Sequence, residues 1–153
     1  MNDDIQVREV THEDFDQWLR LWSGYNEFYG RVGANALPSE ITATTWARFY
    51  DLNEPLDALV AEVGGELVGF ANYLFHRSTT SIAPICYLQD LFTSEAARGR
   101  GVASALIDRV THNARRKGCS RIYWQTHESN DSARRLYERV AERSGFIVYR
   151  KKV

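Results

Sequence analysis

The sequence predicts one mixed α/β domain of the α+β class, with its elements in the order β-α-α-β-β-β-α-β-α-β. Some short segments alternate apolar and polar residues, as half-buried strands do, and others repeat apolar residues at helical spacing. The 153 residues suffice for one hydrophobic core, and no linker or internal repeat divides them. We therefore expect residues 1–153 to form a single domain, with a mixed, mostly antiparallel sheet flanked by four helices.

The first half of the chain predicts a strand, two helices and a hairpin. Thr11 and Asp14 have the spacing of a capping arrangement, and aromatic residues then recur at helical spacing. A loop containing Gly and Pro separates this helix from a second one. The pair Gly64-Gly65 between two apolar runs is a strong hairpin signal. The expected elements are a strand at 5–11, helices at 12–28 and 39–51, and hairpin strands within 57–76.

The second half alternates strands with helices. An apolar segment precedes a helix that runs from Val102 to Lys117, and Gly118 is its expected C-terminal stop. Strands that are joined through helices can pair in parallel, unlike those of the hairpin. The expected elements are strands at 82–93, 120–126 and 146–153, with helices at 102–117 and 130–145, the latter ended by Gly145.

Composition is that of an ordinary globular protein, with 44% apolar and 25% charged residues. No apolar run approaches the length of a membrane span, and the acidic N-terminus does not resemble a secretory signal. These features predict a cytoplasmic protein without a membrane partner. Cys86 and Cys119 lack metal-binding spacing, so we expect buried free thiols and no metal site.

The net charge of −1 hides an uneven distribution: residues 1–95 carry −10 and residues 96–153 carry +9. This asymmetry favours an anionic ligand for the second half and a cationic ligand for the first. Neutralisation of one half by the other across the fold is an equally open interpretation. A nucleic-acid-binding role for the basic half is not expected, because the chain has no recognition-helix motif and is acidic overall.

The segment LQDLFTSEAARGRGVASALIDRV, residues 88–110, predicts a phosphate-binding turn. It places glycines and two arginines at the start of a helix, where backbone N–H groups and the helix dipole attract anions. A P-loop is excluded, since no Gly-Lys-Ser/Thr follows. A dinucleotide-binding fold is disfavoured, because Ser104 replaces the third glycine and more than half of the chain precedes the motif.

The residues Arg98-Gly99-Arg100-Gly101-Val102-Ala103 match R/Q-x-x-G-x-G/A, and this stretch resembles the pyrophosphate-binding signature of GCN5-related N-acetyltransferases (GNAT). The segment NDSARRLY, from Asn130 to Tyr137, looks like the second motif of that family. The resemblance covers nearly the whole chain and implies the GNAT fold, with about six to seven strands and four helices. YLQDLFTSEAARGRGVASALI is similar, more narrowly, to the histone and polyamine (spermidine/spermine) acetyltransferase branch.

This resemblance implies acetyl-CoA as acyl donor. The pantetheine arm would pair with the backbone near Phe92 and Thr93, and the amides of 98–104 would hold the pyrophosphate. Arg134, with Arg135 as the alternative, would approach the phosphates, although either can simply lie on a solvated helix face. The implied cofactor-binding residues are Leu91, Phe92, Thr93, Arg98, Gly99, Arg100, Gly101, Val102, Ala103, Ser104, Asn130, Arg134 and Tyr137.

The resemblance also implies direct transfer of the acetyl group, with Tyr137 as the general acid that protonates the departing thiolate. A core tyrosine is the alternative. An alkylammonium with a pKa of about 10.4 must first lose a proton. The polyamine branch has a Glu where this chain has Gln89, which cannot take one. Asp90 is the neighbouring carboxylate, although strand alternation places it on the face opposite to Gln89.

The expected acceptor is a primary amine, either a polyamine-like small molecule or a lysine side chain. In the family the first two helices and their loop build this site, which selects Tyr25, Glu27 and Tyr29, together with Gln89. A non-catalytic acyl-CoA sensor is the alternative, supported by Gln89. The family usually has one more strand after FIVYRKKV, and an uncovered sheet edge favours a homodimer with paired or exchanged C-terminal strands.

Overall fold

The structure is a computed structural model that describes residues 4–153. Five strands form one sheet and lie side by side in chain order. The first four pair antiparallel, and the fifth pairs in parallel with the fourth. The expected class, α/β with a mostly antiparallel sheet and four helices, is confirmed. The strands are β1 (Gln6–Glu9), β2 (Leu56–Val63), β3 (Glu66–His76), β4 (Ile85–Thr93) and β5 (Ile122–Tyr123).

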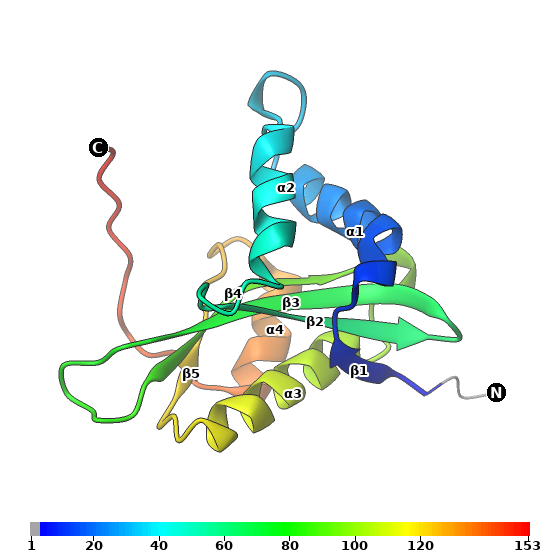
Figure 1. Cartoon of the computed structure of the whole chain (residues 1–153). Helices are drawn as coiled ribbons and strands as arrows, with labels where there is room; N and C mark the ends of the chain where they lie inside the picture. The colour runs from blue at the N-terminus through cyan, green and yellow to red at the C-terminus, as the bar shows by residue number, and fades with distance from the viewer. Residues whose placement is uncertain (1–3) are drawn as a thin grey trace.

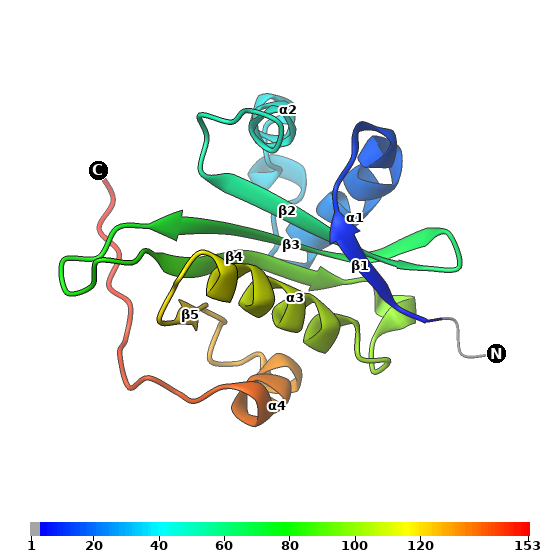
Figure 2. The ribbon, with the colours of Figure 1, turned by 60° about the horizontal axis from the view of Figure 1, so that its bottom comes forward.

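The α-helices cover the sheet in two pairs. Figure 1 shows α1 and α2 on one face, with α3 and α4 on the other, and Figure 2 shows the same two layers after rotation. β1 and the C-terminal end of the chain lie on opposite sides of the molecule (Figure 1). The helices are α1 (Phe15–Phe28), α2 (Ser39–Arg48), α3 (Val102–Arg116) and α4 (Asp131–Val140).

Each face of the sheet carries its own apolar core. On the α1 side, Trp18 is fully buried and stacks on Trp22 with ring centroids 5.4 Å apart. Phe70 of β3 packs against these rings, because its side chain points to the α1 face of the sheet, while its neighbour Ala71 points to the opposite face. On the α3 side, Leu106 and Val110 are fully buried against the opposite side chains of β2, β3 and β4. The sheet is therefore fixed between two helical layers.

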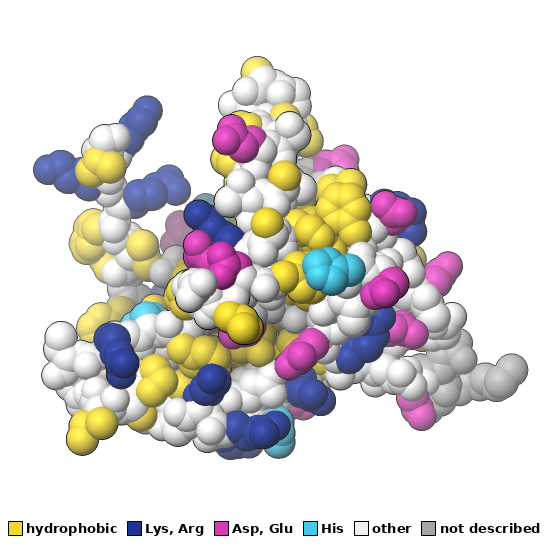
Figure 3. All heavy atoms as spheres, in the orientation of Figure 1, with side chains coloured by type: hydrophobic (Ala, Val, Ile, Leu, Met, Phe, Trp, Pro, Cys, Tyr) yellow, Lys and Arg dark blue, Asp and Glu magenta, His cyan; other side chains and the backbone are white. Residues whose placement is uncertain are grey.

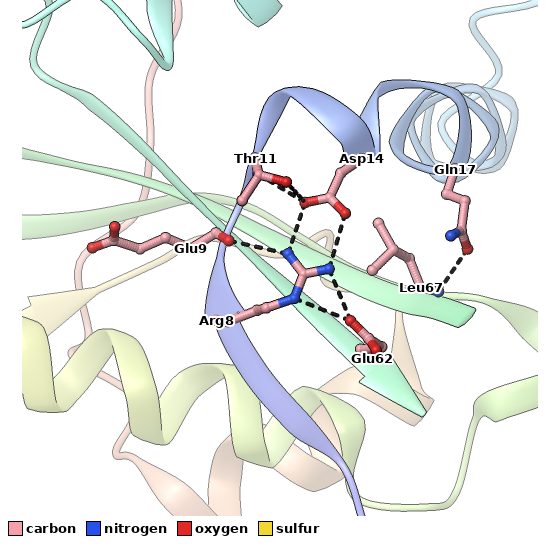
Figure 4. A network of polar contacts seen from close by, with 7 residues as sticks. All are labelled: Arg8, Glu9, Thr11, Asp14, Gln17, Glu62 and Leu67. Carbon is pink, nitrogen blue, oxygen red and sulfur yellow. Dashed lines mark hydrogen bonds and ion pairs between the residues drawn. The ribbon is translucent and has the colours of Figure 1, made fainter. Parts of the chain in front are cut away.

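The start of α1 is tied to the sheet by a charged network (Figure 4). Arg8 of β1 donates to both carboxylate oxygens of Asp14, at 2.7 and 2.9 Å, and to Glu62 of β2 at 2.8 Å. Asp14 also accepts from the backbone N–H of Thr11 at 2.8 Å, which confirms the expected capping contact. The carboxyl of Asp14 is nearly buried, and hydrogen bonds from Arg8 hold its pKa below the usual value.

A β-bulge interrupts β4 at its centre. Asn72 of β3 pairs with Asp90 and the next residue, Tyr73, pairs with Leu88, so Gln89 has no partner. The extra residue changes the phase of the strand. Leu88 and Leu91, three residues apart, both pack on the α3 side. The bulge thereby turns Asp90 toward α1.

The structure corrects several expected elements. The sheet has five strands rather than six or seven, and β5 has two residues rather than the seven of 120–126. The helix expected at 130–145 ends at Val140, because Ala141 is extended (φ −149°, ψ −177°). The helix expected at 39–51 ends at Arg48 and has no buried residue.

The strand expected at 146–153 is absent. The C-terminal segment, residues 141–153, is extended and exposed, and it runs away from α4 without joining the sheet (Figures 1 and 2). Residues 146–149 are aromatic and β-branched, types that strands favour, but a strand also needs a neighbour with free N–H and C=O groups. Among residues 4–153 the nearest sheet edge is the two-residue β5, which is too short to hold it.

Candidate functional site

A cleft of about 460 Å³ opens between the C-terminal end of β4, the start of α3 and α4. The short β5 leaves the C-terminal end of β4 unpaired on the edge that faces away from β3, since β5 pairs only with Cys86 and Tyr87. Leu91, Phe92 and Thr93 therefore present a free strand edge to the cleft. An extended, amide-bearing ligand can pair with such an edge as an added strand.

The start of α3 supplies an anion-binding end to this cleft. Gly99 and Gly101 have φ of +76° and +87°, a conformation that favours glycine, and open space surrounds both. The first bond of the helix runs from the N–H of Ala105 to the carbonyl of Gly101 at 3.0 Å. Within the described chain, no carbonyl accepts from the N–H groups of 99–104. Six amides are thus available to an anion at a helix N-terminus.

These observations fit CoA. The hydroxyl of Thr93 is buried and has no hydrogen-bond partner among residues 4–153, so it can serve a polar group of a ligand in the cleft. The amides of 99–104 suit a pyrophosphate, and the β4 edge suits the amides of a pantetheine arm. Arg98 also lines the cleft. It donates to the carbonyl of Thr93 at 3.3 Å, and its guanidinium lies over the rings of Phe28 and Phe92.

Asp90 is held in a polar cluster beneath α1. Its two carboxylate oxygens accept from the hydroxyl of Tyr25 at 2.6 Å and from the side-chain amide of Asn72 at 3.0 Å. Asn72 is fully buried, and its own carbonyl oxygen has no donor among the described residues. A bound water or a ligand N–H can satisfy that oxygen.

Burial raises the pKa of Asp90, while the hydrogen bonds from Tyr25 and Asn72 and the charge of Arg31 oppose the rise. A carboxylate with a raised pKa is a stronger base, closer to the value that suits proton transfer near neutral pH. Tyr25 cannot compete for this role, because burial and the neighbouring carboxylate raise the pKa of its phenol as well. The cluster is therefore suited to accept one proton at Asp90.

Tyr137 of α4 lines the cleft and packs edge-on against Trp124, with ring centroids 5.4 Å apart. Burial raises the pKa of its phenol to about 12, so the hydroxyl stays protonated at neutral pH. No hydrogen bond within residues 4–153 engages that hydroxyl. It can therefore donate to a ligand atom in the cleft.

A second hollow of about 620 Å³ adjoins the cleft and shares with it Phe28, Tyr29, Asn130 and Ser132. It lies between the loop after α1 and the loop before α4, where His127 accepts or donates a 2.6 Å hydrogen bond with Ser129. Tyr29 is 42% exposed and meets Tyr25 edge-on at 5.0 Å. This hollow gives a second ligand access to the cleft from the α1 side.

The structure brings most of the predicted residues together, but not all. Glu27 is exposed, Gln89 is the unpaired bulge residue, and neither lines the cleft. Arg134 bonds to the carbonyl of Glu128 and pairs with Glu138, while Arg100 is exposed, so these two arginines also lie outside it. The predicted residues that line the cleft are Tyr25, Tyr29, Leu91, Phe92, Thr93, Arg98, Gly99, Gly101, Val102, Ala103, Ser104, Asn130 and Tyr137.

Sequence reasoning missed other residues of the site. Asn72 lies in a strand that otherwise reads as core, and its contact with Asp90 spans 18 positions. Arg139 lines the cleft one helical turn from Arg135, which the sequence offered as the alternative to Arg134; Arg135 lines the cleft and Arg134 does not. The odd spacing of Leu88 and Leu91 on one face is the signal that could have revealed the bulge.

The part of the chain that the structure describes contains neither a cluster of metal-binding side chains nor a helix that could span a membrane. No three His, Cys, Asp or Glu side chains gather as a metal ion would need. None of the helices between residues 4 and 153 combines the length and apolarity needed to cross a membrane. Cys86 is a buried free thiol and Cys119 is half-buried.

Comparison with known proteins gives consistent relatives. A model of the Acetyltransferase (GNAT) family matches residues 13–141. The D-amino-acid N-acetyltransferase HPA3 of Saccharomyces cerevisiae is 33% identical over 153 residues, which cover 99% of this chain and 92% of that protein. The aminoglycoside N(6')-acetyltransferase type 1 of Serratia marcescens is 28% identical, with 92% and 94% covered.

Among solved structures, an aminoglycoside N-acetyltransferase in complex with CoA has the same fold, with a TM-score of 0.78 at 19% identity over 99% of this chain and 97% of that one. None of these three relatives is named as a histone or polyamine acetyltransferase. The narrower resemblance to that branch is therefore not supported.

Proposed function

The chain belongs to the GNAT family of acetyltransferases, and on this premise we propose that it transfers the acetyl group of acetyl-CoA directly to a primary amine of a small molecule. The observation that carries this proposal is the shared cleft. It runs from the amides at the start of α3 to Tyr137 and to Tyr25, which holds the carboxylate of Asp90. Asp90 does not itself line the cleft; the hydroxyl of Tyr25 connects its carboxylate to the cleft wall.

Acetyl-CoA, when bound, supplies the thioester that the amine attacks. The amides of 99–104 bind its pyrophosphate, and the free edge of β4 from Leu91 to Thr93 orients its arm. Arg135 and Arg139, rather than Arg134, lie on the cleft side of α4 and supply positive charge there. The basic second half of the chain fits this polyanionic donor.

Asp90 accepts the proton that the acceptor ammonium must lose, directly or through a water held at the unsatisfied oxygen of Asn72. Tyr25 and Asn72 keep the carboxylate oriented. Tyr137 donates its hydroxyl proton toward the departing sulfur. Asp90 thereby takes the role of the glutamate that was expected at the position of Gln89, because the bulge directs Asp90 toward α1 and Tyr25.

The acceptor is a small-molecule amine. The yeast relative is named for D-amino acids and the Serratia relative for aminoglycosides, both small molecules with amino groups. The hollow beside Tyr29 supports the same class, since its volume of about 620 Å³ is in the range of small-molecule sites. A cytoplasmic location is consistent with the free thiols of Cys86 and Cys119, which a reducing compartment preserves.

A homodimer is also proposed, with the C-terminal segments as its contact. Phe146 and Tyr149 are 90% and 87% exposed in the single chain. Figure 3 shows hydrophobic and basic side chains along this segment, standing apart from the body of the molecule. Burial of such side chains against a second copy would stabilise the pair. A monomeric mass in light scattering would count against the dimer.

Calorimetry and a thiol-release assay test the function together. Acetyl-CoA should bind and raise the Tm, and CoA should be released when a suitable amine is present. Binding without turnover on any of a broad panel of amines would instead favour a non-catalytic acyl-CoA sensor. Failure to bind acetyl-CoA would overturn the proposed function.

A further inference from the structure

Arg31 follows α1 and stands next to Gly30, which lines the second hollow; Arg31 itself is not among the residues that line the hollow or the cleft. Its Nε donates to the side-chain oxygen of Asn26 at 2.6 Å, and its backbone N–H donates to the carbonyl of Asn26 at 2.9 Å. Asn26 is buried and is fixed in turn by donating to the carbonyl of Trp22 at 2.9 Å. The orientation of the guanidinium is therefore set by a buried amide.

Two aromatic rings hold the same guanidinium from the other side. Its central carbon lies 5.4 Å from the ring centre of Tyr25 and 5.2 Å from that of Tyr29. Both rings line the cleft. Cation–π contact keeps an arginine in place without using its N–H groups.

The two terminal nitrogens of Arg31 remain available. Among residues 4–153, neither donates a hydrogen bond and no carboxylate pairs with this side chain. A half-buried arginine whose fork has no partner is unusual, because partly buried charges are normally paired. Two parallel N–H donors match the two oxygens of a carboxylate.

Tyr25 connects this guanidinium to the proton acceptor. Its ring lies under Arg31, and its hydroxyl bonds to Asp90. Arg31 is close enough for its charge to oppose the rise in the pKa of Asp90. The acceptor side thus presents one positive and one negative group around the same tyrosine, a pattern that complements an amine and a carboxylate on one small molecule.

We propose that Arg31 binds the carboxylate of the acceptor, and that the acceptor class is therefore an α-amino acid. This inference rests on the proposed function. A polyamine or an aminoglycoside would place a second cation beside Arg31, which like-charge repulsion disfavours. Arg31 thereby selects a zwitterion over a polycation.

The test compares α-amino acids of both configurations with their amides, in which an uncharged group replaces the carboxylate. Release of CoA from acetyl-CoA is followed for the wild-type chain, Arg31→Gln and Arg31→Lys. Arg20→Gln is the matched control, because Arg20 lies exposed on α1 and does not line the cleft. The KM for acetyl-CoA is measured in parallel for each variant.

The wild-type chain should prefer the best acid over its amide by about 10- to 100-fold in kcat/KM, the worth of a charged hydrogen-bonded contact. Arg31→Gln should abolish that preference by raising the KM for the acid while leaving the KM for acetyl-CoA unchanged. Arg31→Lys should keep part of the preference, and Arg20→Gln should keep all of it.

Three results would overturn the inference alone: equal use of acids and amides by the wild-type chain, a parallel loss of both in Arg31→Gln, or a polyamine used better than every amino acid. If acetyl-CoA binds but no amine of any kind is acetylated, the proposed function itself fails and the inference falls with it.

Discussion

Substitution of Asp90 by Asn removes the proposed proton acceptor while keeping its shape. At pH 7.5 an alkylamine with a pKa of about 10.4 is unprotonated in only about one molecule in 10³. Without a base in the site, only that fraction can attack. We therefore expect kcat/KM to fall by about 10²- to 10³-fold, within the range known for general bases.

The size of this loss should depend on pH, which separates a base from a structural residue. The rate of the wild-type chain should rise with pH as the raised pKa of Asp90 is passed, and then level off. The rate of Asp90→Asn should keep rising until the free amine itself forms, at about pH 10. A profile that runs from acid pH to about pH 10 measures both, and the deficit should shrink toward the alkaline end.

The stability of Asp90→Asn supplies the control. Because burial raises the folded-state pKa of Asp90, the charged form destabilises the fold. The free energy of unfolding therefore decreases as the pH rises from the unfolded-state pKa of Asp90 to its raised folded-state pKa. The uncharged asparagine removes that cost. Its side-chain NH2 would face the NH2 of Asn72, but rotation of the Asn72 amide turns the side-chain oxygen of Asn72, which lacks a donor in the wild-type chain, toward the new N–H. The Tm at neutral pH should stay the same or rise. A constant deficit at every pH, or a clear fall in Tm, would refute the reasoning.

Three further outcomes follow from the same structure. Tyr137→Phe should lower kcat by about 10²-fold in the CoA-release assay. The Tm should change little, since the hydroxyl has no partner in the described chain and the ring contact with Trp124 is kept. An unchanged kcat would exclude Tyr137 as the general acid. Gly101→Ala should raise the KM for acetyl-CoA by about 10-fold or more, because a side chain at φ +87° costs about 1–2 kcal/mol at the phosphate-binding turn. The control is Gly65→Ala, at φ +84° in the hairpin, which should lower only the Tm. Equal effects of the two substitutions on this KM would argue against the turn as the binding site. Asp14→Ala should leave Glu62 as the remaining carboxylate partner of Arg8 and remove the acceptor of the Thr11 N–H. The cost should be about 1–3 kcal/mol, or roughly 2–12 °C in Tm at neutral pH. Because the folded-state pKa of Asp14 is lowered, the difference from wild type should vanish as the pH falls through that pKa, and a difference that persists in acid would contradict the assignment.

Local signals in the sequence predicted the parts of the fold that depend on neighbours in the chain. The helices at 12–28 and 102–117, the Gly64-Gly65 hairpin and the glycine turn at 99–101 follow from periodicity and from residues that favour particular dihedral angles. The C-terminal segment shows the limit of such signals, because a strand forms only if another strand offers an edge.

The catalytic cluster depends on contacts that no short window of sequence contains. Asp90 meets Tyr25 across 65 positions and Asn72 across 18. The bulge at Gln89 decides which face Asp90 occupies, and it arises from the register with β3. Arg31 was missed for the same reason, since only the rings of Tyr25 and Tyr29 mark it as part of the site.

The most direct test of the account is the fate of an isotope-labelled acetyl group. The chain is incubated with labelled acetyl-CoA and a panel of amines that includes α-amino acids, and the products are analysed by mass spectrometry. The account predicts a labelled N-acetyl product with the wild-type chain and at least a hundredfold less with Asp90→Asn at neutral pH. Bound acetyl-CoA without labelled product on any amine would contradict it.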